Sequence, residues 1–275
     1  MTTPLLQLLD GKNIPAIGLG TYNLTGDDGI TAIESAIDSG YTLLDTALNY
    51  KNEREVGEAV RRSGRRDELF ITTKLPGRHH GYDETIASFE ESRANLGIDS
   101  VDLYVIHWPL PKQDKYVESW KAMIELQKQG LIGSIGVSNF TIEYLNRLEA
   151  ETGVLPVVNQ VELHPRFSQS SLRAFHASKG IVTEGWSPLA RRKEVSGEKV
   201  VTDIAEAHGV TPTQAVLRWH VQLGVVPIPK SADAGRQREN LDVFGFELSE
   251  AEMASISSLE SERLWGGDPE THEEF

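Results

Sequence analysis

Eight short apolar runs alternate with segments of helical periodicity along this chain. The predicted strands cover residues 16–20, 42–45, 69–73, 101–106, 134–137, 157–161, 181–184 and 225–228. The predicted helices between and after them cover residues 31–39, 53–62, 83–96, 116–129, 141–152, 169–178, 199–208, 212–223, 236–242 and 250–258. Strands that are apolar on both faces are typical of a covered parallel sheet with right-handed crossovers. Eight such units predict an α/β fold, a (β/α)8 TIM barrel; an open doubly wound sheet is the alternative.

The first segment, residues 5–17, has the pattern of a hairpin. The turn dipeptide Asp10-Gly11 separates two apolar stretches. We expect this N-terminal β-hairpin to close the bottom of the barrel; an isolated edge hairpin is the alternative. Barrels of about 250 residues are single domains, and no linker, repeat or low-complexity tract interrupts the 275 residues. We therefore expect one domain over residues 1–275.

Composition argues against several classes of protein. The net charge of −14 disfavours general binding to nucleic acids or anionic membranes, because those partners need a positive surface. The absence of cysteine excludes disulfides, thiolate catalysis and cysteine zinc sites. The start of the chain lacks a signal-peptide pattern, and no apolar run approaches the ~20 residues that span a bilayer. We expect a soluble, cytoplasmic protein.

The common nucleotide and metal fingerprints are incomplete or missing. The Gly-x-Gly at residues 18–20 lies in the first predicted strand, but the next glycine position of the Rossmann fingerprint holds Asn23. The chain has no Walker phosphate loop and no His-Glu-x-x-His motif. His79, His80 and His164 lack a convincing ligand spacing, so we expect no metal site.

Titratable side chains stand at the ends of three predicted strands. Asp45, Lys74 and His107 each close an apolar run, and Tyr50 follows Asp45 by five positions. The carboxyl ends of barrel strands meet at one mouth, where catalytic groups lie. Taken singly, these residues could be a helix cap, a solvated lysine, a core histidine and a loop tyrosine. At one rim, together, they predict a site that donates a proton to a carbonyl.

Six short motifs occur in order along almost the full chain. They are GYTLLDTA at 40–47 with Glu53 and Gly57, TKL at 73–75, VIHWP at 105–109, GVSNF at 136–140, NQVELHP at 159–165 and IPKS at 228–231. These motifs strongly resemble the aldo-keto reductase family, most closely the bacterial branch that includes 2,5-diketogluconate reductases. The resemblance implies an NADPH-dependent reductase of aldehydes and ketones, with a catalytic tetrad of Asp45, Tyr50, Lys74 and His107.

The tetrad has a physical rationale. Hydride delivery to a carbonyl carbon leaves negative charge on the oxygen, and Tyr50 would supply the proton. A Lys74 ammonium at ~4 Å, in an effective dielectric of ~20, would lower the phenol pKa from about 10 by roughly three units, toward neutrality, although desolvation opposes this. Asp45 would keep Lys74 charged and in place. His107 would donate to, or orient, the carbonyl oxygen.

The resemblance also implies a cradle for the nicotinamide end of NADPH. Ser138, Asn139 and Gln160 would hold the carboxamide. Trp186 would stack on the ring, although core packing explains its position equally well. The other residues expected along this part of the cofactor are Gly20, Thr21, Ser187 and Leu189.

The adenosine end would lie near the last strand. Lys230 and Arg236 stand at a strand end and a helix start, where phosphate binding is favoured; a solvated basic rim is the alternative. We expect these two cations to favour NADPH over NADH by pairing with the 2′-phosphate. The remaining residues that match the family here are Ser231, Glu239 and Asn240.

The substrate side carries the departures from the family pattern. Lys51, Thr42 and Pro76 stand where many members have Gly, Arg and Trp, so the resemblance does not identify the substrate. Residues 259–275 hold six acidic side chains and one arginine, a net charge of −5. A disordered acidic end is one interpretation; the family's C-terminal loop at the barrel mouth is the other. On the second we expect the substrate-binding residues to be Tyr22, Trp108 and Trp265.

Two other functions remain open at this stage. Lys74 could form a Schiff base, as in a lyase on the same fold, or the chain could be a regulatory subunit that senses NADPH without turnover. The favoured function is a reductase of aldehydes, dicarbonyls or keto-sugars. We expect a small-molecule carbonyl substrate, no nucleic-acid or membrane partner, and a monomer.

Overall fold

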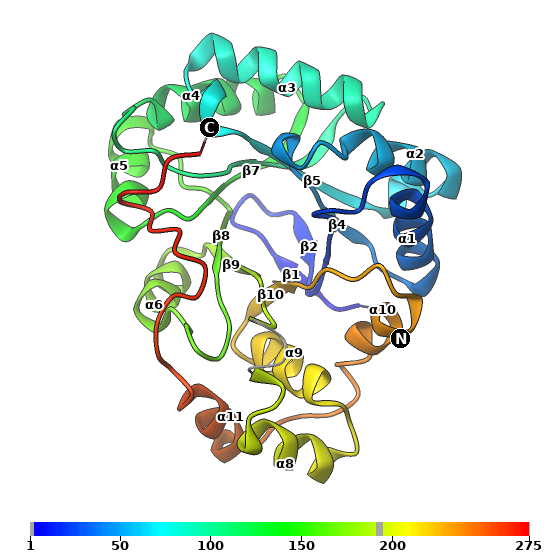
Figure 1. Cartoon of the computed structure of the whole chain (residues 1–275). Helices are drawn as coiled ribbons and strands as arrows, with labels where there is room; N and C mark the ends of the chain where they lie inside the picture. The colour runs from blue at the N-terminus through cyan, green and yellow to red at the C-terminus, as the bar shows by residue number, and fades with distance from the viewer. Residues whose placement is uncertain (1–2, 191–194, 275) are drawn as a thin grey trace.

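The computed structural model describes residues 3–190 and 195–274, and its centre is a closed parallel barrel (Figure 1). The eight strands pair in chain order from β3 to β10. Backbone hydrogen bonds of 3.1 Å, from Gly18 N to Pro227 O and from Gly20 N to Pro229 O, join the first strand to the last. The strands are β3 (Leu19–Gly20), β4 (Leu43–Asp45), β5 (Phe70–Leu75), β6 (Val101–Ile106), β7 (Ile132–Ser138), β8 (Val158–Glu162), β9 (Val182–Trp186) and β10 (Val225–Ile228). The predicted (β/α)8 barrel is confirmed.

Helices form the layer outside the barrel (Figure 1). They are α1 (Gly26–Ser39), α2 (Glu53–Ser63), α3 (Tyr82–Leu96), α4 (Tyr116–Lys128), α5 (Ile142–Thr152), α6 (Ser170–Lys179), α8 (Lys199–His208), α9 (Pro212–Gln222), α10 (Ala234–Leu241) and α11 (Glu250–Ser257). Short 3-10 turns are η1 (Leu48–Tyr50), η2 (Arg66–Glu68) and η3 (Gly77–His79). Thr141 and Thr211 cap two of these helices, because their hydroxyls accept from backbone N–H groups of α5 and α9.

Helix α1 begins five residues earlier than its hydrophobic pattern predicts. Asp27 and Asp28 occupy its first turn, where carboxylates interact favourably with the helix dipole. The Glu55 carboxylate of α2 also accepts from the Gly26 N–H at 2.9 Å, which satisfies one of the free donors at this end. Gly26 and Gly29 favour a loop on sequence grounds, but the contacts made by the three carboxylates stabilise a helix there.

The N-terminal hairpin closes the amino-terminal end of the barrel, as expected. Strands β1 (Leu5–Gln7) and β2 (Asn13–Pro15) pair antiparallel around the predicted turn. The Ser134 hydroxyl, near the start of β7, donates to Asp10 at 2.7 Å, and Lys12 donates to the neighbouring Gly133 carbonyl. Leu8 and Ile14 join the apolar cluster inside the barrel. The opposite mouth is therefore the one left for a ligand.

The C-terminal tail after α11 runs across the carboxyl-end mouth of the barrel (Figure 1). Its backbone is tied down at Ser261, whose N–H donates to Arg166 O at 2.8 Å, and at Leu264, whose N–H donates to Glu162 at 2.7 Å. The predicted C-terminal loop at the mouth is confirmed. No helix within the described ranges is long and apolar enough to cross a membrane.

Candidate active site

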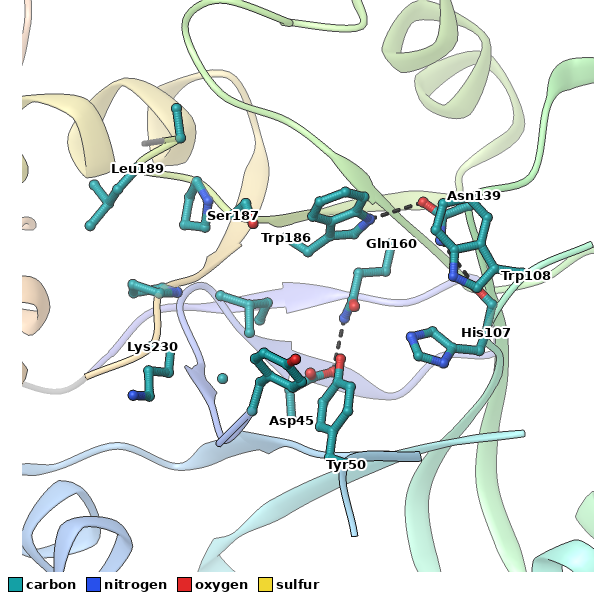
Figure 2. A pocket seen from close by; sticks show the side chains of 16 residues that line it. Asp45, Tyr50, His107, Trp108, Asn139, Gln160, Trp186, Ser187, Leu189 and Lys230 are labelled. Carbon is teal, nitrogen blue, oxygen red and sulfur yellow. Dashed lines mark hydrogen bonds between the residues drawn. The ribbon is translucent and has the colours of Figure 1, made fainter. Parts of the chain in front are cut away.

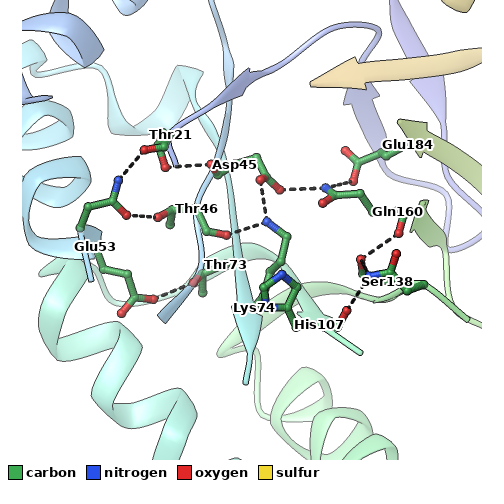
Figure 3. Close-up of polar contacts among 12 residues, drawn as sticks. Thr21, Asp45, Thr46, Glu53, Thr73, Lys74, His107, Ser138, Gln160 and Glu184 are labelled. Carbon is green, nitrogen blue, oxygen red and sulfur yellow. Dashed lines mark hydrogen bonds and ion pairs between the residues drawn. The ribbon is translucent and has the colours of Figure 1, made fainter. Parts of the chain in front are cut away.

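A buried ion pair lies at the base of the mouth. Asp45 ends β4 and Lys74 lies near the end of the adjacent β5, so the two side chains meet with Nζ and Oδ1 2.6 Å apart (Figure 3). Their side chains are 4% and 0% exposed. Burial lowers the pKa of Lys74, but the charges of Asp45 and Tyr50 act against it and the net pKa is raised. Lys74 is therefore a fixed ammonium, which also donates to Thr46 O at 2.9 Å.

Tyr50 lies beside this ammonium. The turn η1 brings its ring to 5.0 Å from Lys74 Nζ, measured to the ring centroid. Burial raises the pKa of the Tyr50 phenol, and the opposing charge of Lys74 does not overcome this effect. The ring is partly exposed to the mouth, yet protein atoms surround it on its other sides. Both effects were expected from the sequence, and in this structure desolvation is the larger, so Lys74 does not bring the phenol toward neutrality. Tyr50 stays protonated and able to donate.

His107 follows β6 directly and faces Tyr50. Its backbone N–H donates to Leu75 O at 3.1 Å, which continues the ladder between β5 and β6 for one more residue. The rings of His107 and Tyr50 lie 5.9 Å apart between centroids, edge to face. On its other side, His107 Nδ1 lies 2.6 Å from an oxygen of Glu274. No sequence signal marks Glu274 among the many acids of the tail, and we did not expect it at the site.

These side chains share one cavity of about 470 Å³ (Figure 2). Its walls bring together three members of the expected tetrad and most of the expected nicotinamide and substrate residues. Lys74 lies below the lining, against Asp45. The expected residues in the lining are Gly20, Tyr22, Asp45, Tyr50, His107, Trp108, Asn139, Gln160, Trp186, Ser187, Leu189 and Lys230. The sequence had placed these residues on one mouth, and the structure brings them together there.

Two expected cofactor residues lie beneath the cavity instead of lining it. Thr21 and Ser138 are buried, and each hydroxyl donates to a strand carbonyl, that of Asp45 at 2.9 Å and that of Gln160 at 2.8 Å. They fix the strands that carry the lining residues. Figure 3 shows both contacts in the same polar network as the ion pair.

Asn139 and Trp186 form one wall of the cavity. The indole Nε1 donates to Asn139 Oδ1 at 2.9 Å, and the Asn139 amide donates to His107 O at 3.0 Å (Figure 2). Asn139 adopts a left-handed φ of 62°, a conformation that asparagine tolerates better than most residues. The indole face is thereby held in place for a planar ligand.

Gln160 links the ion pair to a second buried acid. Its amide nitrogen donates to Asp45 at 2.9 Å and to Glu184 at 3.0 Å (Figure 3). Burial and the Asp45 charge raise the pKa of Glu184 to about 8. The sequence analysis missed Glu184, although an acid inside the apolar strand β9 was a usable signal.

A smaller cavity of about 160 Å³ adjoins the first at Leu189 and Lys230. Of the expected adenosine-end residues it also includes Ser231, Arg236 and Asn240 in its lining. Asp233 caps α10 and accepts from Arg236 N at 2.8 Å, which sets the first turn of the helix beside this cavity. A flat indole, amide groups and a cationic far end, along two joined cavities, suit an elongated cofactor with nicotinamide and phosphate groups.

Glu239 and Trp265 lie outside both cavity linings. Glu239 accepts from the Thr211 hydroxyl at 2.7 Å and so joins α10 to the start of α9. Trp265 is 48% exposed on the tail. The tail reaches the expected substrate wall through His272, whose ring lies 4.0 Å from that of Trp108 between centroids. The roles predicted for Glu239 and Trp265 stay predictions.

Comparison with known proteins agrees with this geometry. A family model described as the aldo/keto reductase family matches residues 16–261. The chain belongs to the aldo/keto reductase family. It is 57% identical to 2,5-diketo-D-gluconic acid reductase B from Corynebacterium sp. (strain SHS752001), over 99% of each chain. The family and branch inferred from the motifs are confirmed, and the protein is an oxidoreductase.

Other relatives agree over nearly their whole length. Methylglyoxal reductase DkgA from Escherichia coli (strain K12) is 47% identical over 97% of each chain. A solved structure of a Gox0644 mutant in complex with NADPH is 44% identical, with a TM-score of 0.95 over 99% of this chain and 100% of that one. Within residues 3–190 and 195–274 of this chain, no group of three or more His, Asp or Glu side chains could hold a metal ion.

Proposed function

We propose that this aldo/keto reductase uses NADPH to reduce aldehyde or ketone carbonyls to alcohols, with Tyr50 as the proton donor. The observation that carries the proposal is the buried Asp45–Lys74 pair beside Tyr50, at a cavity that His107 also lines. A fixed ammonium next to a protonated phenol is suited to giving up a proton and stabilising the resulting phenolate. The NADPH complex of the structural relative supports the choice of cofactor.

The chain's own groups account for the acid half of the reaction. NADPH, when bound, supplies a hydride to the carbonyl carbon. The Tyr50 hydroxyl gives its proton to the carbonyl oxygen, and Lys74 stabilises the phenolate that forms. Asp45 keeps the ammonium charged and in position. His107 orients the carbonyl oxygen toward Tyr50. The products are an alcohol, NADP⁺ and a Tyr50 phenolate, which then takes a proton from water.

The cofactor fits along the two joined cavities. Trp186 offers its face to the nicotinamide ring, with Asn139 and Gln160 at the carboxamide. Lys230 and Arg236 lie at the far end, where a phosphate group meets two cations and the first turn of α10. A nicotinamide ring held by Trp186 would share the cavity that Tyr50 also lines.

The names of the relatives suggest the class of substrate. One relative is named for a diketo acid of a sugar and another for methylglyoxal, and both compounds carry two carbonyl groups. We therefore favour small dicarbonyls and keto-sugars as substrates. The cavity of about 470 Å³ is adequate for such molecules beside a nicotinamide ring.

Replacing Tyr50 with phenylalanine tests the proposal. Phenylalanine keeps the ring and removes the donor, so kcat should fall by at least about 100-fold, the scale of general acid catalysis. The dissociation constant of NADPH should stay within about twofold, because the residue does not hold the cofactor. NADPH absorbance with a panel of dicarbonyls gives kcat, and fluorescence titration gives the affinity. Substantial retained kcat would mean that another group, with His107 the first to examine, supplies the proton.

The Schiff-base alternative has less support. A nucleophilic lysine must be neutral, whereas the charges of Asp45 and Tyr50 outweigh burial and hold Lys74 as an ammonium with a raised pKa. Borohydride trapping of a covalent adduct between protein and substrate would reverse this preference. No observation favours a regulatory subunit without turnover. The cytoplasmic location and the monomeric state stay predictions.

A further inference from the structure

The second-last residue of the chain, Glu274, reaches into the site from the C-terminal tail. Its Oε1 lies 2.6 Å from His107 Nδ1 and accepts from the Asn49 amide at 2.5 Å. Its Oε2 accepts from the Gly77 N–H at 2.9 Å. The side chain is only 11% exposed, although it belongs to the last residues of an acidic segment. The carboxylate is therefore held by a built set of donors and not by chance contact at a chain end.

The charge of Glu274 persists in this enclosed position. Burial acts to raise the pKa of the Glu274 carboxyl, but the His107 ring and the donors at Gly77 and Asn49 more than offset it, and the pKa is lowered to about 2. Nδ1 of His107 lies 2.6 Å from this carboxylate without an aligned hydrogen bond between them. A permanent negative charge thus lies against one nitrogen of a proposed active-site histidine.

The neighbouring tail contacts explain how the carboxylate arrives there. The His272 ring packs against Trp108 at an interplanar angle of 39°, and Glu273 pairs with Lys112 at 2.7 Å. Farther back, Leu264 is tied to Glu162. Figure 1 shows the tail passing α6 and α5 on its way to the α3–α4 side of the mouth. Glu273 and Glu274 are adjacent acids, but only Glu274 turns inward to the histidine.

We propose that Glu274 is a positioning residue for His107: the tail carboxylate holds the Nδ1 side of the ring and leaves Nε2 available to the carbonyl oxygen in the cavity. The proposal rests on the role given to His107 in the proposed function. Glu274 is not among the residues that line the cavity.

The chemical reason is that the two nitrogens of the imidazole have different roles, since Nδ1 faces the carboxylate and Nε2 would face the carbonyl oxygen. A carboxylate at one ring nitrogen fixes the ring orientation and favours a hydrogen at that nitrogen. Its negative charge also stabilises the ring when both nitrogens carry hydrogen, the form that can donate to a carbonyl oxygen. In this way the last residues of the chain would contribute to the chemical step as well as to the wall of the substrate site.

Three variants test the inference. Glu274→Gln removes the charge and keeps the shape, Glu274→Ala removes both, and Glu273→Gln is the matched control one residue earlier. We expect both Glu274 variants to lower kcat on the order of 10-fold, the low end of the loss when the outer partner of a metal-ligating histidine is removed. NADPH affinity should stay within about twofold. Glu273→Gln should leave kcat nearly unchanged, because Glu273 contacts only the outer Lys112 in this region.

A second measurement needs no turnover. Long-range ¹H–¹⁵N spectra of the histidine rings, with His107 assigned through His107→Asn, report which ring nitrogen carries hydrogen. We expect hydrogen at Nδ1 in the wild type and a changed ring signal in Glu274→Gln only. Unchanged His107 signals in Glu274→Gln would overturn the inference. A KM increase with wild-type kcat would overturn it too, because it would mean that Glu274 shapes the substrate site and does not position His107.

These outcomes separate the inference from the function on which it rests. Wild-type protein that reduced no carbonyl in the panel would contradict the proposed function, and the ring spectra would still decide the Glu274 contact. An active wild type with Glu274→Gln equal to Glu273→Gln in kcat would contradict the inference alone.

Discussion

Lys74 keeps a full positive charge where water does not reach it. The cost of removing an ammonium from water is several kcal/mol, and only close partners offset it. Here the partners are the Asp45 carboxylate at 2.6 Å and the Thr46 carbonyl at 2.9 Å. Asp45 in turn accepts from Gln160. The reactive position beside Tyr50 is thus maintained by residues from three different strand ends.

Glu184 gives this network a measurable pH dependence. Its pKa is about 8 in the folded protein and about 4.3 in an unfolded chain. Between those values the folded state binds a proton that the unfolded state lacks, so this group's contribution to the free energy of unfolding falls as the pH rises. Glu184→Gln mimics the protonated acid and should remove that part of the fall. Urea denaturation at pH about 5 and about 8 measures the difference.

Glu206→Gln, at an exposed position on α8, is the control for this experiment. It should leave the change in urea midpoint between the two pH values as in the wild type. If Glu184→Gln also kept the wild-type difference, Glu184 would not be the buried acid responsible.

Arg236 should read the 2′-phosphate of the cofactor. It is exposed beside the smaller cavity, at the first turn of α10, and a guanidinium matches phosphate geometry. A hydrogen bond to a charged group contributes about 1.5–3 kcal/mol, so Arg236→Ala should weaken NADPH binding by roughly 10- to 100-fold and NADH binding much less. Fluorescence titration with each cofactor measures both. Arg238→Ala, on the same helix outside the lining, should change neither; equal losses for both cofactors from Arg236→Ala would remove the phosphate assignment.

At the scale of elements, the contact between α2 and α3 depends on one glycine. A Cβ added to Gly57 would lie 2.0 Å from the Leu96 carbonyl oxygen at the end of α3. That atom is backbone and cannot rotate away, so Gly57→Ala must separate the two helices. Overpacking of this kind costs about 3 kcal/mol of unfolding free energy. Chemical denaturation should show the loss, with the largest changes in hydrogen exchange in α2 and α3.

Gly26→Ala is the comparison for the same experiment. Gly26 has φ +63° and nothing within 4 Å of an added Cβ, so the substitution introduces backbone strain without a clash. It should cost about 1 kcal/mol. A Gly57→Ala protein as stable as Gly26→Ala would mean that the helices adjust more easily than the close backbone approach indicates.

Periodicity predicts the elements well because local signals and tertiary packing agree in this fold. The apolar runs place Asp45 and Lys74 at strand ends, and the strands β4 and β5 end within two residues of the expected positions. Boundaries differ where polar residues extend an element. Strand β7 continues through Ser138, whose hydroxyl bonds to β8, and α1 gains its first turn from Asp27 and Asp28. A prediction made from the spacing of apolar residues alone does not include such polar contacts.

At the scale of the whole molecule, the sequence could not predict which residues of the tail meet the site. The role of Trp265 at the substrate stays a prediction, and the structure shows two tail contacts that were not expected, His272 against Trp108 and Glu274 against His107. Each of these two contacts joins residues more than 160 positions apart in the chain, and no local sequence pattern predicts it. The sequence also could not decide the direction of the Tyr50 pKa shift, because that direction depends on burial by the assembled barrel.

Removal of the tail is the test of the molecule as a whole. A chain that ends at Arg263 loses three features together: the contact of the His272 ring with Trp108, the Glu274 carboxylate and the Trp265 side chain. We expect KM for carbonyl substrates to rise by about tenfold, equivalent to about 1.4 kcal/mol of lost contact, and the ranking of substrates to change. The kcat should fall as well, through the loss of Glu274. NADPH affinity should stay within about twofold, because neither cofactor cavity includes residues 264–274 in its lining.

Two comparisons assign the effects of this truncation. Trp265→Ala alone should alter the substrate ranking if that side chain contacts substrate, while Glu274→Gln alone should reproduce the fall in kcat. Circular dichroism should show that the truncated barrel is folded, since residues 264–274 follow the last helix and belong to none of the apolar clusters of the core. Unchanged KM values and substrate ranking in the truncated enzyme would show that the tail covers the mouth without shaping the substrate site. In that case kcat alone, of these properties, would depend on the tail.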